Sequence, residues 1–174
     1  HSVGSPPPSA ADPPGPRTLS PVLYATHARV HLSAIAQNLR AVRERVGDRL
    51  VLAAVKANAY GHGAVAVSQM LQDTGAADWL GVATVPEVTE LRAAGIEMPI
   101  LKLSHVFPHE LEAAVAARTT LVVVDEATLR AADEAARKAS TTVDCHLKVD
   151  TGMRRIGTSP TTAPELARLA ETLP

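Results

Sequence analysis

Residues 50–63 read LVLAAVKANAYGHG, and this stretch decides how the chain is expected to fold. Its first six residues are all apolar, a pattern typical of a strand that is buried on both faces of a parallel sheet. The apolar run ends at Lys56, which opens a loop containing two glycines. Functional groups gather at the carboxyl ends of the strands in α/β folds. The sequence therefore places Lys56 where a functional site is expected.

Strand and helix patterns alternate along the rest of the chain. Strands are predicted over 28–32, 50–55, 79–82, 100–103, 120–124 and 142–149. Helices are predicted over 35–46 after an N-cap at Ser33, over 65–71, 85–94 and 109–118, from Asp125 or Glu126 to about 139, and from Pro164 onward. After the first short strand this alternation gives about five βα units, the signature of a parallel sheet.

Two α/β architectures fit these units. One is a partial (β/α)8 TIM-type barrel, because a complete barrel takes about 250 residues and the chain has 174. The other is a complete doubly wound sheet of five strands, which fits the length without truncation. The periodicity alone does not separate them.

Composition narrows the class of protein further. Apolar residues make up 46% of the chain but aromatic residues only 2%, so Ala, Val, Leu and Ile must form the core. The 17 Lys and Arg residues are balanced by 18 Asp and Glu, which leaves no basic excess for nucleic acid. The single cysteine, Cys145, excludes an intrachain disulfide and a Cys-rich metal site. We expect a buried, inert thiol and no metal.

Targeting and domain signals are few. No apolar run approaches the ~18 residues that a membrane span needs, and no signal peptide is visible. A cytoplasmic protein that does not bind membranes is expected. Residues 1–22 are rich in Pro, Ser, Gly and Ala and are predicted to be disordered, since such a segment buries too little apolar surface to fold. Residues 23–174 form the folded part.

The Lys56 loop has the composition of a reactive-amine site. Burial lowers the pKa of a lysine, and a less protonated amine can form a Schiff base or remove a proton. Gly61 and Gly63 permit close backbone approach or positive φ, and Tyr60 supplies a hydroxyl group nearby. His62 has no second ligand at metal spacing and is expected to form a hydrogen bond within the loop.

A second polar strand exit lies at residues 144–157, which read DCHLKVDTGMRRIG. Alternation along a strand puts His146 and Lys148 on one face, which lines the barrel interior if Leu147 faces the helices. An interior lysine needs an anionic partner or must lose its charge, and Asp150 is the nearest candidate. Beyond the strand, Arg155 offers a planar guanidinium to an anionic oxygen.

These segments carry a family resemblance. KANAYGHG, at 56–63, is similar to the cofactor-lysine motif of alanine racemases, and HLKVDTGMRRIG, at 146–157, resembles their second signature. ARVHLSAIAQN, at 28–38, resembles the entry strand and first helix of that family. The order and separation of all three agree. Arg154 departs from the family pattern, which often has a small or polar residue there, and is expected to be solvated.

The resemblance implies a fold-type III enzyme that holds pyridoxal 5'-phosphate in the mouth of an eight-stranded barrel, followed by a mostly β domain. It implies that Lys56 forms the Schiff base and acts as the base on one face of alanine. Tyr60 would bind the cofactor phosphate and Arg155 the ring oxygen. Lys148 matches a lysine that is carbamylated in many members, and a carbamylated Lys148 would pair with Arg155.

The same resemblance implies an isomerase that acts as a homodimer and supplies D-alanine for peptidoglycan. The second base would be a tyrosine from the partner subunit's β domain, which this chain lacks, so the chain alone is expected to be inactive. Alternatives are a serine or broader-specificity racemase, another fold-type III activity such as a decarboxylase or dehydratase, a non-catalytic barrel that carries pyridoxal phosphate, and a plain structural βα domain.

Overall fold

The chain is described by a computed structural model that covers residues 27–173, so the predicted disorder of residues 1–22 lies outside the described residues. The strands are β1 (Leu52–Ala54), β2 (Trp79–Val82), β3 (Ile100–His105), β4 (Thr119–Val123) and β5 (Cys145–Leu147). The helical segments are α1 (Leu32–Val46), α2 (Lys56–Gly61), α3 (Ala64–Thr74), α4 (Val85–Ala93), α5 (Leu111–Ala116), α6 (Glu126–Lys138) and α7 (Ala163–Thr172). In α2, residues 57–60 turn in the left-handed sense. A short 3-10 turn, η1 (Pro108–Glu110), precedes α5.

The order of the strands decides between the two predicted architectures. The sheet runs β1-β2-β3-β4-β5, and every neighbouring pair is parallel. A doubly wound sheet would reverse its strand order at a switch point, and no reversal occurs among the described strands. Sequential parallel pairing is the arrangement of a (β/α)8 barrel, so the five strands form a sector of one.

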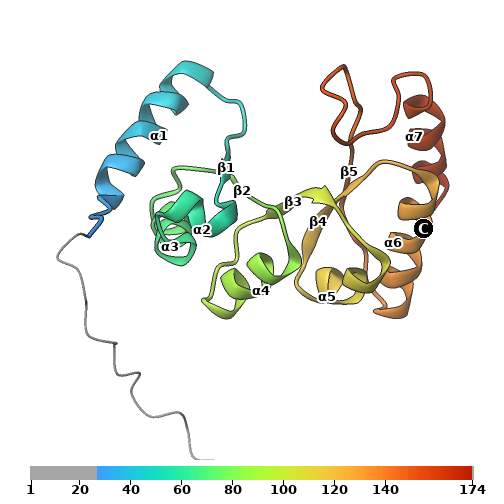
Figure 1. Ribbon diagram of the computed structural model, residues 1–174, viewed down its shortest axis with the longest axis horizontal. Coiled ribbons are helices and arrows are strands. Elements are labelled where there is room, and N and C mark those ends of the chain that lie inside the picture. Colours follow the sequence, from blue (N-terminus) through green and yellow to red (C-terminus); the bar gives the residue numbers. More distant parts are fainter. Residues whose placement is uncertain (1–26, 174) are drawn as a thin grey trace, which may run out of the picture.

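The helices support the same conclusion. Figure 1 shows α3, α4, α5 and α6 following one another along one side of the sheet, and consecutive helices of this row contact each other. A doubly wound fold would place helices on both faces. The helix side of the sheet is therefore the outside of the barrel sector, and the opposite face is its interior.

The two faces of the sheet differ in burial. Leu80, Val82 and Leu121 are completely buried between the strands and the helices. On the interior face, by contrast, Leu52 is 38% exposed. Gly81 allows this face to pack closely, because a Cβ at this position would lie 2.7 Å from Leu52 Cδ2. The apolar area buried on the outer face, at about 25 cal/mol per Å², is the main source of stability.

Most predicted elements are confirmed with shifted ends, and one is wrong. The strand predicted over 28–32 does not form. His31 is extended, with φ −103° and ψ 96°, but no strand lies beside this segment among residues 27–173, and α1 begins at Leu32 without a cap from Ser33. The strand predicted over 142–149 is reduced to β5, followed by an isolated bridge between Val149 and Thr158.

Candidate functional site

The candidate site lies along the edge of the sheet where the parallel strands end. Lys56 directly follows β1, and the segment from Lys148 to Gly157 follows β5. Val55, which is 2% exposed, donates its backbone N–H to the Gly81 carbonyl at 2.8 Å and so fixes the end of β1 against β2. Lys56 is half-buried at this fixed point.

The backbone after Lys56 turns in the left-handed sense. Four consecutive non-glycine residues, 57–60, have φ between 51° and 55° and ψ between 38° and 50°. An L-residue in a left-handed helix costs about 1–2 kcal/mol, because its Cβ approaches the following carbonyl oxygen. Such a turn persists only where its surroundings hold it, and strained backbone of this kind clusters at functional sites.

Hydrogen bonds anchor the turn at both ends. Ala59 N donates to the Val55 carbonyl at 2.7 Å. The Asn58 side chain accepts from Ala64 N at 2.7 Å and so joins the turn to the start of α3. His62 Nδ1 lies 2.8 Å from the Ala59 carbonyl, which confirms the expected hydrogen bond within the loop. Ala59 is buried, and the turn is thereby tied to the core.

The turn brings Lys56 and Tyr60 together. Lys56 Nζ lies 5.9 Å from the centre of the Tyr60 ring, a favourable cation–π distance. Within residues 27–173 the Lys56 amine has no hydrogen bond or ion pair, and Tyr60 is 62% exposed. The amine and the phenol are thus both available to a ligand at the strand end.

Lys148 lies on the interior face, as alternation predicts. Leu147 packs on the outer side with Val123 and Leu166, so its neighbours along β5 face inward. His146 meets the Trp79 ring of β2 at a centroid distance of 5.7 Å. Lys148 Nζ donates to the Leu103 carbonyl of β3 at 3.3 Å. The amine thus reaches across the interior face to the second strand along.

The segment after β5 is organised by Asp150. One carboxylate oxygen accepts from the backbone N–H of Gly152 at 2.9 Å and of Arg154 at 3.0 Å. These two N–H groups, Arg154 first, hold the pKa of Asp150 below its usual range. Asp150 N and Thr158 N add backbone bonds that close the loop.

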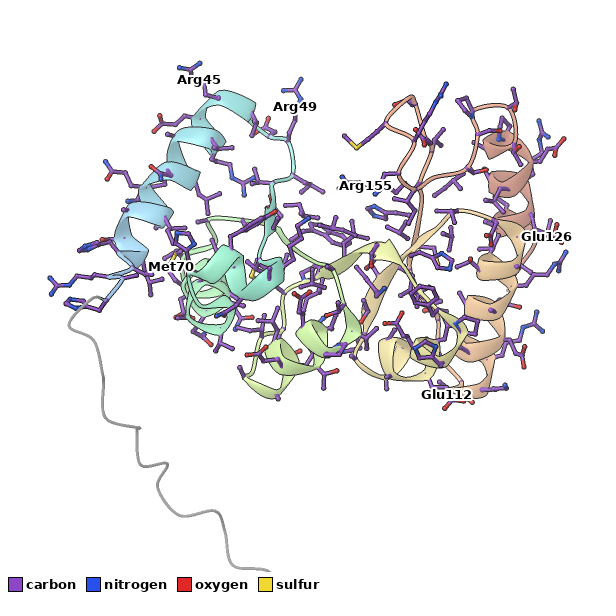
Figure 2. All side chains as sticks on the ribbon, in the orientation of Figure 1. Arg45, Arg49, Met70, Glu112, Glu126 and Arg155 are labelled. Atoms are coloured by element: carbon purple, nitrogen blue, oxygen red, sulfur yellow. The ribbon has the colours of Figure 1, made fainter. Side chains whose placement is uncertain are left out.

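The predicted ion pair between Lys148 and Asp150 is therefore wrong. The Asp150 carboxylate bonds to the backbone of its own loop instead, because two N–H groups two and four residues ahead lie closer than an amine on the interior face. Arg155 is exposed, and its guanidinium contacts Met153 Sδ at 3.5 Å. Figure 2 shows Arg155 on the side of this loop that faces β1. Lys148 and Arg155 do not touch in the described chain.

Glu87 is a residue of the site that the sequence reasoning missed. Its Oε1 accepts from Ala57 N at 2.7 Å, and its Oε2 accepts from Ala83 N at 2.7 Å and Thr84 N at 2.9 Å. Burial alone would raise the pKa of Glu87, but these three N–H groups outweigh it and lower the pKa. The available signal was T-x-x-E at 84–87, a capping box that starts α4.

Comparison with known proteins identifies the family to which this chain belongs. Residues 30–174 match the model for the alanine racemase N-terminal domain. The chain belongs to the alanine racemase N-terminal domain family. The resemblance inferred from the motifs at 56–63 and 146–157 is thereby confirmed, and so is the barrel fold.

Individual relatives agree with this family. The chain is 51% identical over 156 residues to an alanine racemase of Cutibacterium acnes, covering 90% of the chain and 40% of that protein. It is 42% identical to an alanine racemase of Mycobacterium ulcerans, covering 87% of the chain and 38% of that protein. The crystal structure of an alanine racemase from E. faecalis superposes with a TM-score of 0.76 at 34% identity, over 83% of the chain and 39% of that structure.

The chain thus spans about 40% of the length of the curated relatives it matches. No helix between residues 27 and 173 has the length and apolar character to cross a membrane. In the same range, no group of three or more His, Cys, Asp or Glu side chains is arranged to hold a metal ion.

Proposed function

We propose that this chain is the front part of an alanine racemase that uses pyridoxal phosphate, and that Lys56 is its cofactor lysine and one of its two bases. The observation that carries the proposal is the placement, at the end of β1 in a member of this family, of a half-buried amine that has no hydrogen bond or ion pair within residues 27–173. Barrel enzymes carry their chemistry at this edge.

The residues along this edge fit such a cofactor. An amine, a phenol and a guanidinium are the groups that suit an aldehyde, a phosphate and a ring oxygen, and Lys56, Tyr60 and Arg155 supply one of each. Tyr60 and Arg155 are both exposed, so neither must break a strong contact to bind. When bound, pyridoxal phosphate supplies a conjugated ring that delocalises the negative charge left on the substrate Cα.

The chain's own contribution is to position groups and move a proton. Lys56 would hold the cofactor covalently until the substrate's own amine displaces it, and the freed Lys56 amine would then take the Cα proton of D-alanine. In the opposite direction, from L-alanine, the protonated Lys56 amine would give a proton to Cα. Tyr60 would bind the phosphate and Arg155 would orient the ring. The rigid end of β1 keeps the amine within reach of Cα, as near-attack geometry requires.

Racemisation needs a second base on the opposite face of Cα. We propose that this base is a tyrosine of the partner subunit in a homodimer, contributed by a β domain beyond this chain, so that the chain alone is inactive. The protein would act in the cytoplasm on alanine and supply D-alanine for peptidoglycan. The relatives' name, alanine racemase, supports alanine as the substrate.

Lys148 is proposed to be carbamylated. Its amine has only the Leu103 carbonyl as a hydrogen-bond partner within residues 27–173. Addition of CO2 would replace this cation with an anion that can orient the Arg155 guanidinium. Carbon-13 NMR of the folded protein in 13C-bicarbonate should show a carbamate carbonyl signal that Lys148→Ala removes, since a lysine carbamate loses CO2 on unfolding and digestion. A spectrum without this signal at saturating bicarbonate would contradict the proposal.

The function is tested with the full-length protein, which includes the proposed β domain, and with two lysine variants. Borohydride reduction in the presence of pyridoxal phosphate, followed by peptide mass spectrometry, should fix the cofactor on Lys56. Lys56→Ala should lower the rate of alanine interconversion by at least about 10⁴-fold. Lys138→Ala, which removes an exposed lysine paired with Glu134, is the control and should change neither readout. Labelling of a different lysine would overturn the assignment.

A further inference from the structure

The left-handed turn after Lys56 poses a question about what fixes the direction of the amine. Residues 57–60 adopt four unfavourable backbone conformations, so a small loss of support should let them relax toward the right-handed region. Relaxation would rotate the peptide that links Lys56 to Ala57 and would move the lysine side chain with it. The contact nearest to Lys56 therefore matters most.

That contact comes from Glu87. Ala59 N, His62 N and Gly63 N bond to backbone carbonyls within 55–59. Ala57 N, one residue after Lys56, instead donates to Glu87 Oε1 at 2.7 Å. A bond from a backbone N–H to a carboxylate is charge-assisted and stronger than a neutral one. The amide next to the lysine is thus held by a side chain 30 residues away.

Glu87 is itself held in place. Its second oxygen accepts from Ala83 N and Thr84 N, the residues that link β2 to α4, and Thr84 Oγ1 accepts in return from Glu87 N at 3.4 Å. Val85 and Val88 on either side are buried, at 4% and 0% exposed. The carboxylate thereby ties the Lys56 turn to the neighbouring βα junction.

We propose that Glu87 is a positioning residue, whose carboxylate holds the Ala57 amide and so sets the direction in which the Lys56 amine leaves the strand. The capping box accounts only for the contacts of Glu87 Oε2. Oε1 instead accepts a hydrogen bond from the turn that carries Lys56. The proposal rests on the proposed function of Lys56 for its catalytic consequence, but the effect on the turn itself does not depend on it.

The test uses the intact protein and compares Glu87→Ala with Thr84→Ala. Both remove the side-chain part of the α4 cap, but only the first removes the acceptor of Ala57 N. Amide hydrogen exchange over residues 56–61 should accelerate by at least about tenfold in Glu87→Ala and stay within about twofold of wild type in Thr84→Ala.

Catalysis and labelling give independent readouts. A misplaced reacting group costs up to about 10²-fold, so Glu87→Ala should lower kcat by about 10- to 100-fold with a smaller change in KM. The rate at which borohydride fixes pyridoxal phosphate on Lys56 should fall in parallel. Glu90→Gln, an exposed residue on the same helix, should leave all three readouts unchanged.

A second variant covers a failure of Glu87→Ala to fold. Glu87→Gln keeps the shape of the side chain but must present an NH2 group to one of the two sets of N–H donors, so it should produce a smaller change of the same kind. Wild-type exchange over 56–61 in a folded Glu87 variant would overturn the proposal. Faster exchange combined with no cofactor on Lys56 even in wild type would instead uphold the contact and reject the proposed function.

Discussion

The two polar segments at the edge of the sheet are held by different means. The turn after β1 is held from outside by Glu87 of α4 and by the start of α3, and it contains buried Ala59. The loop after β5 is held mainly by its own residue Asp150 and by a bridge to Thr158, while residues 151–155 are all exposed. A strained backbone conformation is thus supported by packing in one segment and by local capping in the other.

This difference shows which of the two segments holds its side chains in a fixed position. The part that carries Lys56 shares its contacts with the core and cannot shift without disturbing α3 and α4. The part that carries Arg155 can adjust without breaking the core, because its contacts begin and end within the loop. Four experiments separate these two modes of support.

The largest effect is expected at Gly157. A Cβ at Gly157 would lie 2.5 Å from Asp150 N, whereas a Cβ at Gly152 would meet nothing within 4 Å. Both glycines have unfavourable φ values for other residues, 144° and 134°. Gly157→Ala should therefore lower the free energy of unfolding by at least about 2 kcal/mol more than Gly152→Ala, measured by urea denaturation. Equal losses of stability would show that the close approach of residue 157 to Asp150 N adds nothing to the cost of the substitution.

The next comparison uses two residues with the same left-handed φ of 55°, Asn58 and Arg154. Asn58→Ala removes the acceptor for Ala64 N and a residue that tolerates this conformation, so it should cost about 1–2 kcal/mol of stability. Arg154→Ala removes an exposed side chain and should change stability by less than about 0.5 kcal/mol. Thermal melts of both variants check this difference. A cost at Arg154 as large as at Asn58 would contradict local support of the loop.

A pH titration tests Asp150. Its pKa is lowered in the folded loop, so its contribution is fully present above the usual value of 3.8 and is lost as the pH falls through the folded pKa. The amide NMR signals of Gly152 and Arg154 should shift together with a midpoint below 3.8. The signal of Ala57 should follow the separate titration of Glu87. A common midpoint for all three amides would indicate a single cooperative transition.

The last experiment concerns Cys145 of β5, where a change in the loop after β5 is expected to have no effect. Burial, with a smaller contribution from Asp144, raises the pKa of its thiol to about 11. At pH 8 only about one thiol in a thousand is then ionised. A maleimide should modify Cys145 far more slowly in the folded protein than after unfolding in urea, with no effect of Arg154→Ala on the rate. Rapid modification in the folded state would show that movement of the loop after β5 exposes the Cys145 thiol.

Local patterns were enough to predict most of the fold. The apolar runs at 79–82 and 100–103 and the N-cap at Asp125 correspond to elements that form at those places, because burial and capping act over short distances. The strand at 28–32 could not be judged in this way, since a strand needs a partner and no pattern in the segment reveals whether one is present. The number of strands likewise did not distinguish a barrel from a doubly wound sheet.

The site was predictable from local patterns only in part. Lys56 and Lys148 could be placed from alternation along their strands, and the face of Lys148 is confirmed. Apart from Asn58, the left-handed turn at 57–60 had no sequence signal, because Ala and Tyr do not favour it. Glu87 was visible as a capping residue, but its bond to Ala57 depends on the pairing of β2 with β1, which brings the start of α4 to the turn after β1. The pairing of Lys148 with Asp150 failed for a local reason, since the backbone N–H groups of Gly152 and Arg154 compete for the carboxylate.

The strictly sequential order of the sheet has a consequence for how the protein is made. Every strand pairs with the strand that precedes it, so each βα unit can dock on finished structure as it leaves the ribosome. Among residues 27–173, β1 has no strand on its other side, so its backbone groups there stay available for pairing. Of the described units, the one that carries Lys56 is therefore the first to leave the ribosome and still has one open edge when β5 has docked.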